Sequence, residues 1–259
     1  MLLPVTGIDV DLRSPAGAED LLLVEGGPLD MRLAVSVLER LTRDLDGAPI
    51  DPRALPIAEL DVLLLELRRR LIGDVVSAEA RCSATECAAR VDISFSIAGY
   101  LAHHAPTPKS EVISTDEPGW YRMADEDLAF RIPQVADHLA IAGSADPEHA
   151  LVARCIRGTP TSEQRARIEA AMEAMAPSLY ADLAGVCPEC GVAVAATFDP
   201  LRYILRELRD QSATIYDDVS VIAHHFHWSE AEILALPKPR RMRYAEIATD
   251  HARQLGLAT

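Results

Sequence analysis

The 259-residue sequence predicts a mainly α-helical protein in which a small β ribbon joins two helical lobes. Three observations predict this class. Apolar residues recur every three or four positions over several long stretches, which is typical of amphipathic helices. Only 5% of the residues are aromatic, so we expect a core of Leu, Val, Ile and Ala, which suits helices. Two short cysteine pairs, each between stretches with strand-like patterns, indicate where the ribbon lies.

Four of the five cysteines form two short-spaced pairs: Cys82 with Cys87, and Cys187 with Cys190. Both spacings suit knuckles that hold a zinc ion, and Gly191 accepts the positive φ that such a knuckle needs. The 99 residues 88–186 separate the pairs. We therefore expect a split β zinc ribbon in which the four thiolates bind one structural Zn²⁺ and clip remote parts of the chain together.

Two other fates of these cysteines stay open, because the same spacings could give disulfides or inert buried thiols. The sequence lacks a secretory signal, which favours metal over disulfides. A catalytic zinc is disfavoured because it needs an open coordination position, and four thiolates leave none. The fifth cysteine, Cys155, lies on an apolar helical stripe and is expected to be a core residue.

Each cysteine pair lies between two strand-like segments, 74–81 and 90–97 for the first pair, and 179–186 and 192–198 for the second. Helical patterns precede both arrangements. The order helix, strand, cysteine pair, strand therefore occurs twice, which indicates a weak internal duplication.

Charge and hydropathy exclude several classes of protein. The net charge is −15, with a pI near 4.9, and this argues against nucleic-acid binding, which depends on Lys and Arg. The sequence has no apolar run near 18 residues and no signal peptide at its start, so we expect a soluble, cytoplasmic protein without a membrane partner. No acid/base or nucleophile constellation is evident. We therefore expect a protein without enzymatic activity or a small-molecule substrate.

The sequence suggests four regions. We expect a flexible arm over residues 1–28, an N-terminal helical lobe over 29–80, a split zinc-ribbon region with an inserted hairpin and helices over 81–198, and a C-terminal helical lobe over 199–259.

In the N-terminal lobe, Asp30 is expected to cap a helix that ends at Gly47. A second helix follows over residues 57–72. The three arginines at positions 68–70 suit the negative end of its dipole, with a phosphate site as the alternative.

The inserted part is expected to be irregular after Ile97 and to form a hairpin over residues 120–133. The acidic turn 125–127 is expected to be solvated, since it lacks the remaining ligands of a calcium loop. Helices are expected at 137–142 and 146–158, and a capping box at Thr161 opens another one that runs to Met175.

The C-terminal lobe should begin with a long helix over residues 201–226, with a break near 211–214. A capping box formed by Ser229 and Glu232 opens the next helix. The adjacent His224 and His225 could belong to a metal site, but adjacent positions on a helix point to different sides, so we expect surface and packing roles.

Several segments in this order resemble a known family. They are the helix at 60–73, the knuckle Cys82–Cys87, the run 130–133 (Phe-Arg-Ile-Pro), the run 137–139 (Asp-His-Leu), residues 151–156, the knuckle 187–191 (Cys-Pro-Glu-Cys-Gly), Phe198-Asp199, the run 228–234 (Trp-Ser-Glu-Ala-Glu-Ile-Leu) and the run 240–244 (Arg-Arg-Met-Arg-Tyr). Together they resemble the T4-type baseplate hub assembly chaperone family of contractile tails, in the version found in phage-like injection systems. The first pair departs from that pattern, because its spacing is longer and lacks Pro and Gly.

This resemblance implies a non-enzymatic assembly chaperone or accessory baseplate protein whose partners are baseplate hub, spike or wedge subunits. A second hypothesis is a zinc-ribbon adaptor or regulator that binds nucleic acid through its basic C-terminal helix, which carries Lys238, Arg240, Arg241 and Arg243. A third, a metal hydrolase, would need an open zinc site and a general base.

Overall fold

The computed structural model describes residues 1–107 and 110–254, which divide into two units. The first unit comprises Met1–Asp9 and Asp51–Tyr203, and the second comprises Val10–Ile50 and the chain from Ile204 onward. The boundaries expected at residues 28, 80 and 198 differ from this division. The reason is that segments far apart in the sequence pack together, which local patterns do not reveal. Residues 255–259 of the expected C-terminal lobe lie outside the described residues.

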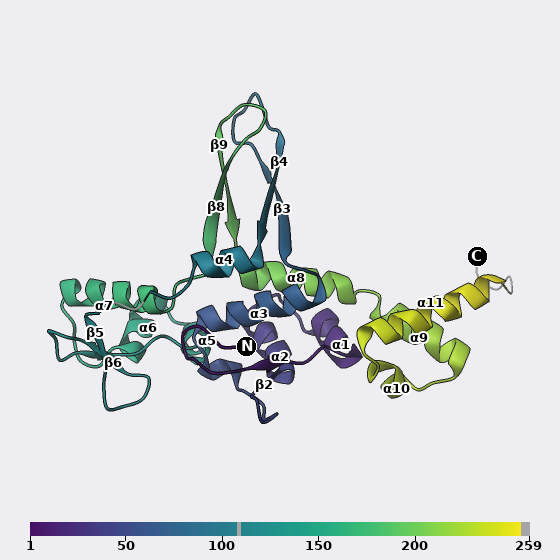
Figure 1. Cartoon of the computed structure of the whole chain (residues 1–259), viewed down its shortest axis with the longest axis horizontal. Helices are drawn as coiled ribbons and strands as arrows, with labels where there is room; N and C mark the ends of the chain where they lie inside the picture. Colours follow the sequence, from purple (N-terminus) through teal and green to yellow (C-terminus); the bar gives the residue numbers. More distant parts are fainter. Residues whose placement is uncertain (108–109, 255–259) are drawn as a thin grey trace. The chain divides into compact units, whose positions relative to one another are not determined.

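The described chain is mainly helical, and its strands form small antiparallel sheets (Figure 1). The helical segments of the first unit are η1 (Pro52–Ala54, a 3₁₀ turn), α3 (Ile57–Leu71), α4 (Ile97–His103), α5 (Val135–Ile141), α6 (Pro147–Cys155) and α7 (Ser162–Met175). Its strands are β3 (Val75–Arg81), β4 (Arg90–Ser96), β5 (Val112–Ser114), β6 (Tyr121–Met123), β7 (Ala129–Phe130), β8 (Ala181–Val186) and β9 (Ala193–Phe198).

Helices also dominate the second unit. Its elements are β1 (Asp11–Leu12), α1 (Gly17–Glu25), α2 (Met31–Leu41), β2 (Thr42–Arg43), α9 (Ile215–Phe226), α10 (Glu230–Leu234) and α11 (Lys238–Gln254). Helix α8 (Pro200–Ser212) begins in the first unit and continues into the second. The Asp30 side chain caps α2 as expected, but the helix ends at Leu41 and not at Gly47.

The N-terminal residues of the first unit are held by a carboxylate of α3. Glu59 is fully buried, and its Oε1 accepts hydrogen bonds from the amides of Val5 and Thr6 at 2.8 and 2.7 Å. Burial raises the pKa of Glu59 even though these hydrogen bonds oppose the shift. Residues 1–28 therefore differ from the expected flexible arm, because this loop is bonded to α3 and residues 17–25 form helix α1.

Two antiparallel hairpins, β3–β4 and β8–β9, run away from α4, and the loops at their far ends carry the cysteine pairs (Figure 1). Three aromatic rings meet at the base of the hairpins. The ring centroid of Phe198 lies 5.0 Å from that of Phe95 and 5.4 Å from that of Tyr100. The Tyr100 hydroxyl donates to the Leu179 carbonyl at 2.6 Å. The hairpins are thus joined at their base by packing.

Helix α4, which carries Tyr100, replaces the irregular stretch expected after Ile97. Ser96 begins the helix, because its Oγ accepts a hydrogen bond from the Gly99 amide at 3.0 Å. The expectation was wrong because this capping serine is also the last residue of β4, so the strand pattern hides the helix start.

The inserted hairpin expected at 120–133 is confirmed, since β6 and β7 pair antiparallel with Tyr121 opposite Phe130. Strand β5 adds a third strand. A small core joins this sheet to α7: Met123, Phe130, Ile156, Ile168 and Ala171. The acidic turn is bound to α7 as well, because Arg167 pairs with Asp125 and Glu126.

In the second unit, the expected break in the long helix falls between α8 and α9. Nearby, buried ion pairs connect three helices. Arg241 of α11 is 1% exposed and pairs with Asp20 of α1 and with Asp218 of α9. The Ser212 hydroxyl donates to Asp20 at 2.6 Å. The start of α11 is thereby fixed to α1 and α9.

Candidate metal centre

The four paired cysteines meet at the ends of the two hairpins. Their Sγ atoms all lie within 4.8 Å of one another, and the cluster consists of Cys82, Cys87, Cys187 and Cys190. The Sγ atoms of Cys82 and Cys190 are 3.5 Å apart, and those of Cys87 and Cys187 are 3.8 Å apart. All four are free thiols, so the disulfide alternative is not realised here.

These separations fit one tetrahedral metal ion. Metal–sulfur bonds of about 2.3 Å place the ligands of a tetrahedral ion about 3.8 Å apart. Both short contacts join one cysteine of the first hairpin to one of the second, so a single ion at the centre would bind both loops. The expected meeting of the two remote pairs is therefore present, and its geometry is compatible with a bound metal.

The backbone of each loop supports its first cysteine in the same way. The amide of Cys82 donates to the Ala89 carbonyl at 2.9 Å, and the amide of Cys187 donates to the Val192 carbonyl at 2.9 Å. Each hydrogen bond extends the ladder of its hairpin by one step beyond the last strand pair. The strands therefore position the first ligand of each pair.

Hydrogen bonding makes the Cys187 thiol more acidic than an ordinary cysteine thiol. The amides of Cys190 and Glu189 lower the pKa of Cys187 to about 7 against the opposing effect of burial. The Ala89 amide also favours the Cys87 thiolate, but the neighbouring thiols and burial outweigh it and raise the pKa of Cys87 to about 12. Four negative sulfurs at these distances need a cation between them.

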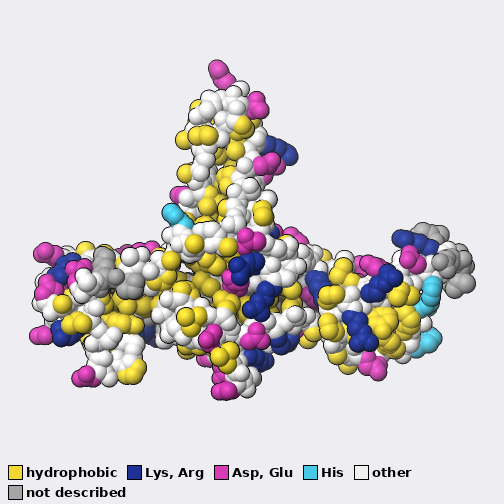
Figure 2. Space-filling model, in the orientation of Figure 1, with side chains coloured by type: hydrophobic (Ala, Val, Ile, Leu, Met, Phe, Trp, Pro, Cys, Tyr) yellow, Lys and Arg dark blue, Asp and Glu magenta, His cyan; other side chains and the backbone are white. Residues whose placement is uncertain are grey.

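The site is shielded on one side and open on the other. Cys82 and Cys187 are buried beside two apolar side chains, Val91 and Val194, whereas Cys190 is exposed. The solvent-exposed side of the cluster, at Cys190, allows an ion to enter. Figure 2 shows further apolar side chains along the outside of the hairpins.

The fifth cysteine is outside the cluster, as expected. Cys155 is buried, its Sγ lies 3.9 Å from Asp137 Oδ2, and burial raises its pKa to about 11. Asp137 itself is bound by Arg131 and Arg154. A thiol with a raised pKa, beside a carboxylate that two arginines already hold, is a poor nucleophile.

The arginines at the end of α3 have internal partners. Arg68 is buried and donates to the Gly73 carbonyl at 2.5 Å, and Arg69 pairs with Glu66 at 2.8 Å. These contacts favour the helix-end role over a phosphate site.

The basic residues of α11 are also engaged within the second unit. Lys238 donates to the Gln211 carbonyl at 2.8 Å, Arg241 is buried, and Arg243 pairs with Glu246 at 3.0 Å. Arg240 lies over the Tyr244 ring, 5.8 Å from its centroid.

Histidines of α9 and α11 meet in a way that the sequence did not reveal. Nε2 of His225 lies 3.1 Å from Nδ1 of His251, whereas His224 points elsewhere on the helix. The two residues are 26 positions apart, so no local spacing links them.

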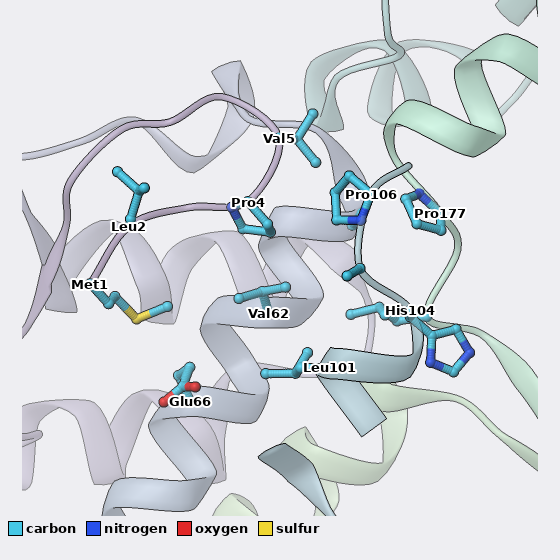
Figure 3. Close-up of a pocket in the computed structure, with 13 residues that line it drawn as sticks. Met1, Leu2, Pro4, Val5, Val62, Glu66, Leu101, His104, Pro106 and Pro177 are labelled. Atoms are coloured by element: carbon cyan, nitrogen blue, oxygen red, sulfur yellow. The ribbon is translucent and has the colours of Figure 1, made fainter. Parts of the chain in front are cut away.

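An apolar pocket of about 240 Å³ lies in the first unit between the N-terminal loop, α3 and the end of α4 (Figure 3). Val62 and Leu101 line it together with three prolines, Pro4, Pro106 and Pro177. Its two titratable side chains already have partners. Glu66 pairs with Arg69, and His104 Nδ1 lies 2.9 Å from the Tyr100 carbonyl. The pocket thus brings together no acid, base and nucleophile.

No helix within residues 1–107 and 110–254 combines the length and the apolar character needed to cross a membrane. Comparisons of the chain with family models, curated proteins and solved structures find no match.

Proposed function

We propose that this protein is a non-enzymatic assembly factor of a contractile tail or phage-like injection system, in which a structural zinc ion joins two remote hairpins into one docking arm. The observation that carries the proposal is the convergence of Cys82, Cys87, Cys187 and Cys190 within 4.8 Å. The link to contractile tails rests on the sequence resemblance described above.

Zinc is the ion that this donor set favours. Thiolates are soft ligands, and tetrahedral S₄ sites in proteins hold zinc or iron. Zinc has no geometric preference of its own from d-electrons and accepts the compact arrangement of two knuckles. Metal analysis of protein purified under reducing conditions should give one zinc per chain. Cobalt substitution should give a spectrum of four thiolate ligands, and a spectrum with an open position would contradict the proposal.

A closed site of this kind supports a structural role. Four protein ligands leave no position for water or substrate, which a catalytic zinc requires. Within the described residues, this cluster is the only group of three or more His, Cys, Asp or Glu side chains that could hold a metal. The geometry therefore gives the hydrolase hypothesis no support.

Docking is supported by the way in which the hairpins are held. A metal would join them at their far ends, and Phe95, Tyr100 and Phe198 join them at their base. Two apolar side chains flank the second cysteine pair on the outside, with Val186 68% exposed and Val192 41% exposed. A stiff arm with exposed apolar residues near its tip suits contact with another subunit, because little conformational freedom is lost on binding.

The proposal can be tested in a strain that carries the complete gene cluster. Pull-down of the wild-type protein should recover a hub, spike or wedge subunit, and the double variant Cys187→Ser/Cys190→Ser should lose it. Cys155→Ala is the matched control, since this cysteine is buried outside the cluster. Recovery of none of these subunits, together with normal particles in a deletion strain, would overturn the proposal.

Nucleic-acid binding is the second candidate, and the contacts of α11 give it little support. Four of its five Lys and Arg side chains already have partners in the second unit, namely Lys238, Arg241, Arg243 and Arg253. Binding to phosphates would require these contacts to break. A mobility shift that weakens steeply with salt would favour this candidate over the first.

A further inference from the structure

We infer that His225 and His251 form a second metal site, a two-histidine chelate for a borderline divalent cation such as Ni²⁺, Cu²⁺ or Zn²⁺. The site lies entirely in the second unit, so it is independent of the four cysteines and of the proposed function. The inference rests on three observations: the distance between the ring nitrogens, the place of both residues on their helices, and their exposure.

The distance between the two nitrogens suits a chelate. Nε2 of His225 and Nδ1 of His251 are 3.1 Å apart. Two imidazole nitrogens that bind one ion at about 2.1 Å in adjacent positions lie about 3.0 to 3.4 Å apart. The planes of the two rings differ by 50°, and their centroids are 5.1 Å apart.

Helix geometry places negative potential at this point. His225 lies in the last turn of α9, and His251 lies in the last turn of α11. The C-terminal end of a helix carries a partial negative charge, and cations are stabilised there. The ends of two helices therefore favour a cation between the same two side chains that supply its ligands.

Exposure leaves the remaining coordination positions to water. His251 is exposed and His225 is half-buried. The Phe226 ring lies edge-on to His225, with the centroids 4.7 Å apart, and restricts the orientation of the imidazole. Histidine side chains gather at this end of the α9–α11 lobe in Figure 2. Nickel, copper and zinc all accept two imidazoles with water in the other positions.

A bound ion would join the last turn of α11 to α9. The starts of the two helices are already connected, because Arg241 of α11 pairs with Asp218 of α9 at 3.2 Å. The chelate would connect their other ends. Ligand binding to the folded state stabilises it, so the ion should raise the melting temperature of the protein.

The experiment uses the full-length, untagged, zinc-loaded protein, because a histidine tag would itself bind nickel. Titration with NiCl₂ should show one nickel bound in addition to the zinc held by the cysteines. His225→Ala and His251→Ala should each lower the affinity for nickel by more than about tenfold, the loss that removal of an outer-shell partner already causes, because each removes one of the two ligands. Nickel should raise the melting temperature of the wild type and of neither variant.

His224→Ala is the matched control, because His224 is an exposed histidine on the same helix turn. This variant should bind nickel like the wild type. His251→Gln serves as a second variant if the alanine substitution disturbs α11, and the zinc content of every variant confirms that the cysteine site is intact. Equal binding by the wild type, His225→Ala and His251→Ala would overturn the inference, as would an equal loss in His224→Ala.

Discussion

Ala88 and Gly191 occupy equivalent backbone positions in the two cysteine loops. Each follows the second cysteine of its pair and precedes the residue whose carbonyl accepts a hydrogen bond from the first cysteine's amide. Both have a positive φ, 44° for Ala88 and 75° for Gly191. The two loops therefore turn in the same way although their cysteine spacings differ. This left-handed conformation costs alanine about 1 to 2 kcal/mol of conformational free energy, a cost that glycine does not have.

Exchanging these two residue types should change stability in opposite directions. Ala88→Gly should stabilise the zinc-loaded protein by about 0.5 kcal/mol, the strain relieved minus the entropy that a new glycine adds to the unfolded chain. Gly191→Ala should destabilise it by about 1 kcal/mol through backbone strain. A steric clash does not contribute, since an added Cβ at Gly191 meets nothing within 4 Å. Denaturant titration measures both changes.

Gly185→Ala is the control for the glycine substitution. Gly185 also has open space around an added Cβ, and its φ is not positive. This change should be neutral or slightly stabilising. A destabilisation equal to that of Gly191→Ala would contradict the role assigned to the positive φ.

Removal of the metal should loosen both hairpins. Binding of a structural zinc supplies on the order of 10 kcal/mol, and apo sites of this type lose their local fold. Hydrogen exchange should therefore accelerate in strands β3, β4, β8 and β9 of the apo protein and of Cys187→Ser/Cys190→Ser. Cys155→Ala should keep one zinc per chain with unchanged exchange in these strands. Equal protection with and without metal would show that packing alone holds the hairpins.

Asp61 of α3 should make the folded state less stable as the pH rises. It is 8% exposed, one of its oxygens has no partner, and burial together with the charge of Asp199 raises its pKa to about 8. The unfolded chain releases this proton near pH 4. Asp61 therefore does not lower the free energy of unfolding below about pH 4. Between the two pKa values this free energy falls by about 1.4 kcal/mol per pH unit.

Asp61→Asn removes this titrating group. The free energy of unfolding, measured by denaturant titrations between pH 5 and pH 8, should then depend less steeply on pH. The variant should be more stable than the wild type at pH 8, since it buries no charge. Asp92→Asn, a change at an exposed position of β4, should leave the slope unchanged. A parallel slope in Asp61→Asn and the wild type would contradict the raised pKa.

Asp137 should have the opposite pH dependence. Burial opposes its ionisation, but hydrogen bonds from Arg131, the Gln134 amide and Arg154 hold the pKa of Asp137 well below its ordinary value. Its contribution to stability is therefore present above about pH 4 and is lost as the pH falls below that value. Asp137→Asn should cost about 3 kcal/mol at pH 7, because it leaves Arg131 without its charge partner.

The control for Asp137 is Asp125→Asn. Asp125 pairs with Arg167 at an exposed position, and such pairs contribute at most about 1 kcal/mol. Acid titration of stability should separate the two variants. Equal losses at pH 7 would contradict the importance given to the buried pair.

The sequence predicted those features that depend on neighbours in the chain. The capping box of α7 is present, with the Gln164 amide donating to Thr161 Oγ1 at 3.2 Å, and the inserted hairpin pairs as expected. The cysteine cluster was also predicted, because ligand spacing within each pair is local and four thiolates suit one ion. Membership of the chain in a tail-assembly family remains a prediction.

Apart from the cysteine cluster, features that depend on distant residues were not predicted. Glu59 binds amides at positions 5 and 6 of the chain, more than 50 residues away, and no local pattern marks either partner. The same holds for the packing of residues 10–50 with the C-terminal helices, which determines the division into two units. His225 and His251 meet only because α9 and α11 lie side by side.

The long separation of the two cysteine pairs has a consequence for biosynthesis. Cys82 and Cys190 are 108 positions apart, and ribosomes add about 5 to 20 residues per second. The first pair is therefore made about 5 to 20 s before the second. During this time the nascent chain carries two of its four ligands, and the metal can be fully enclosed only after translation has passed residue 190.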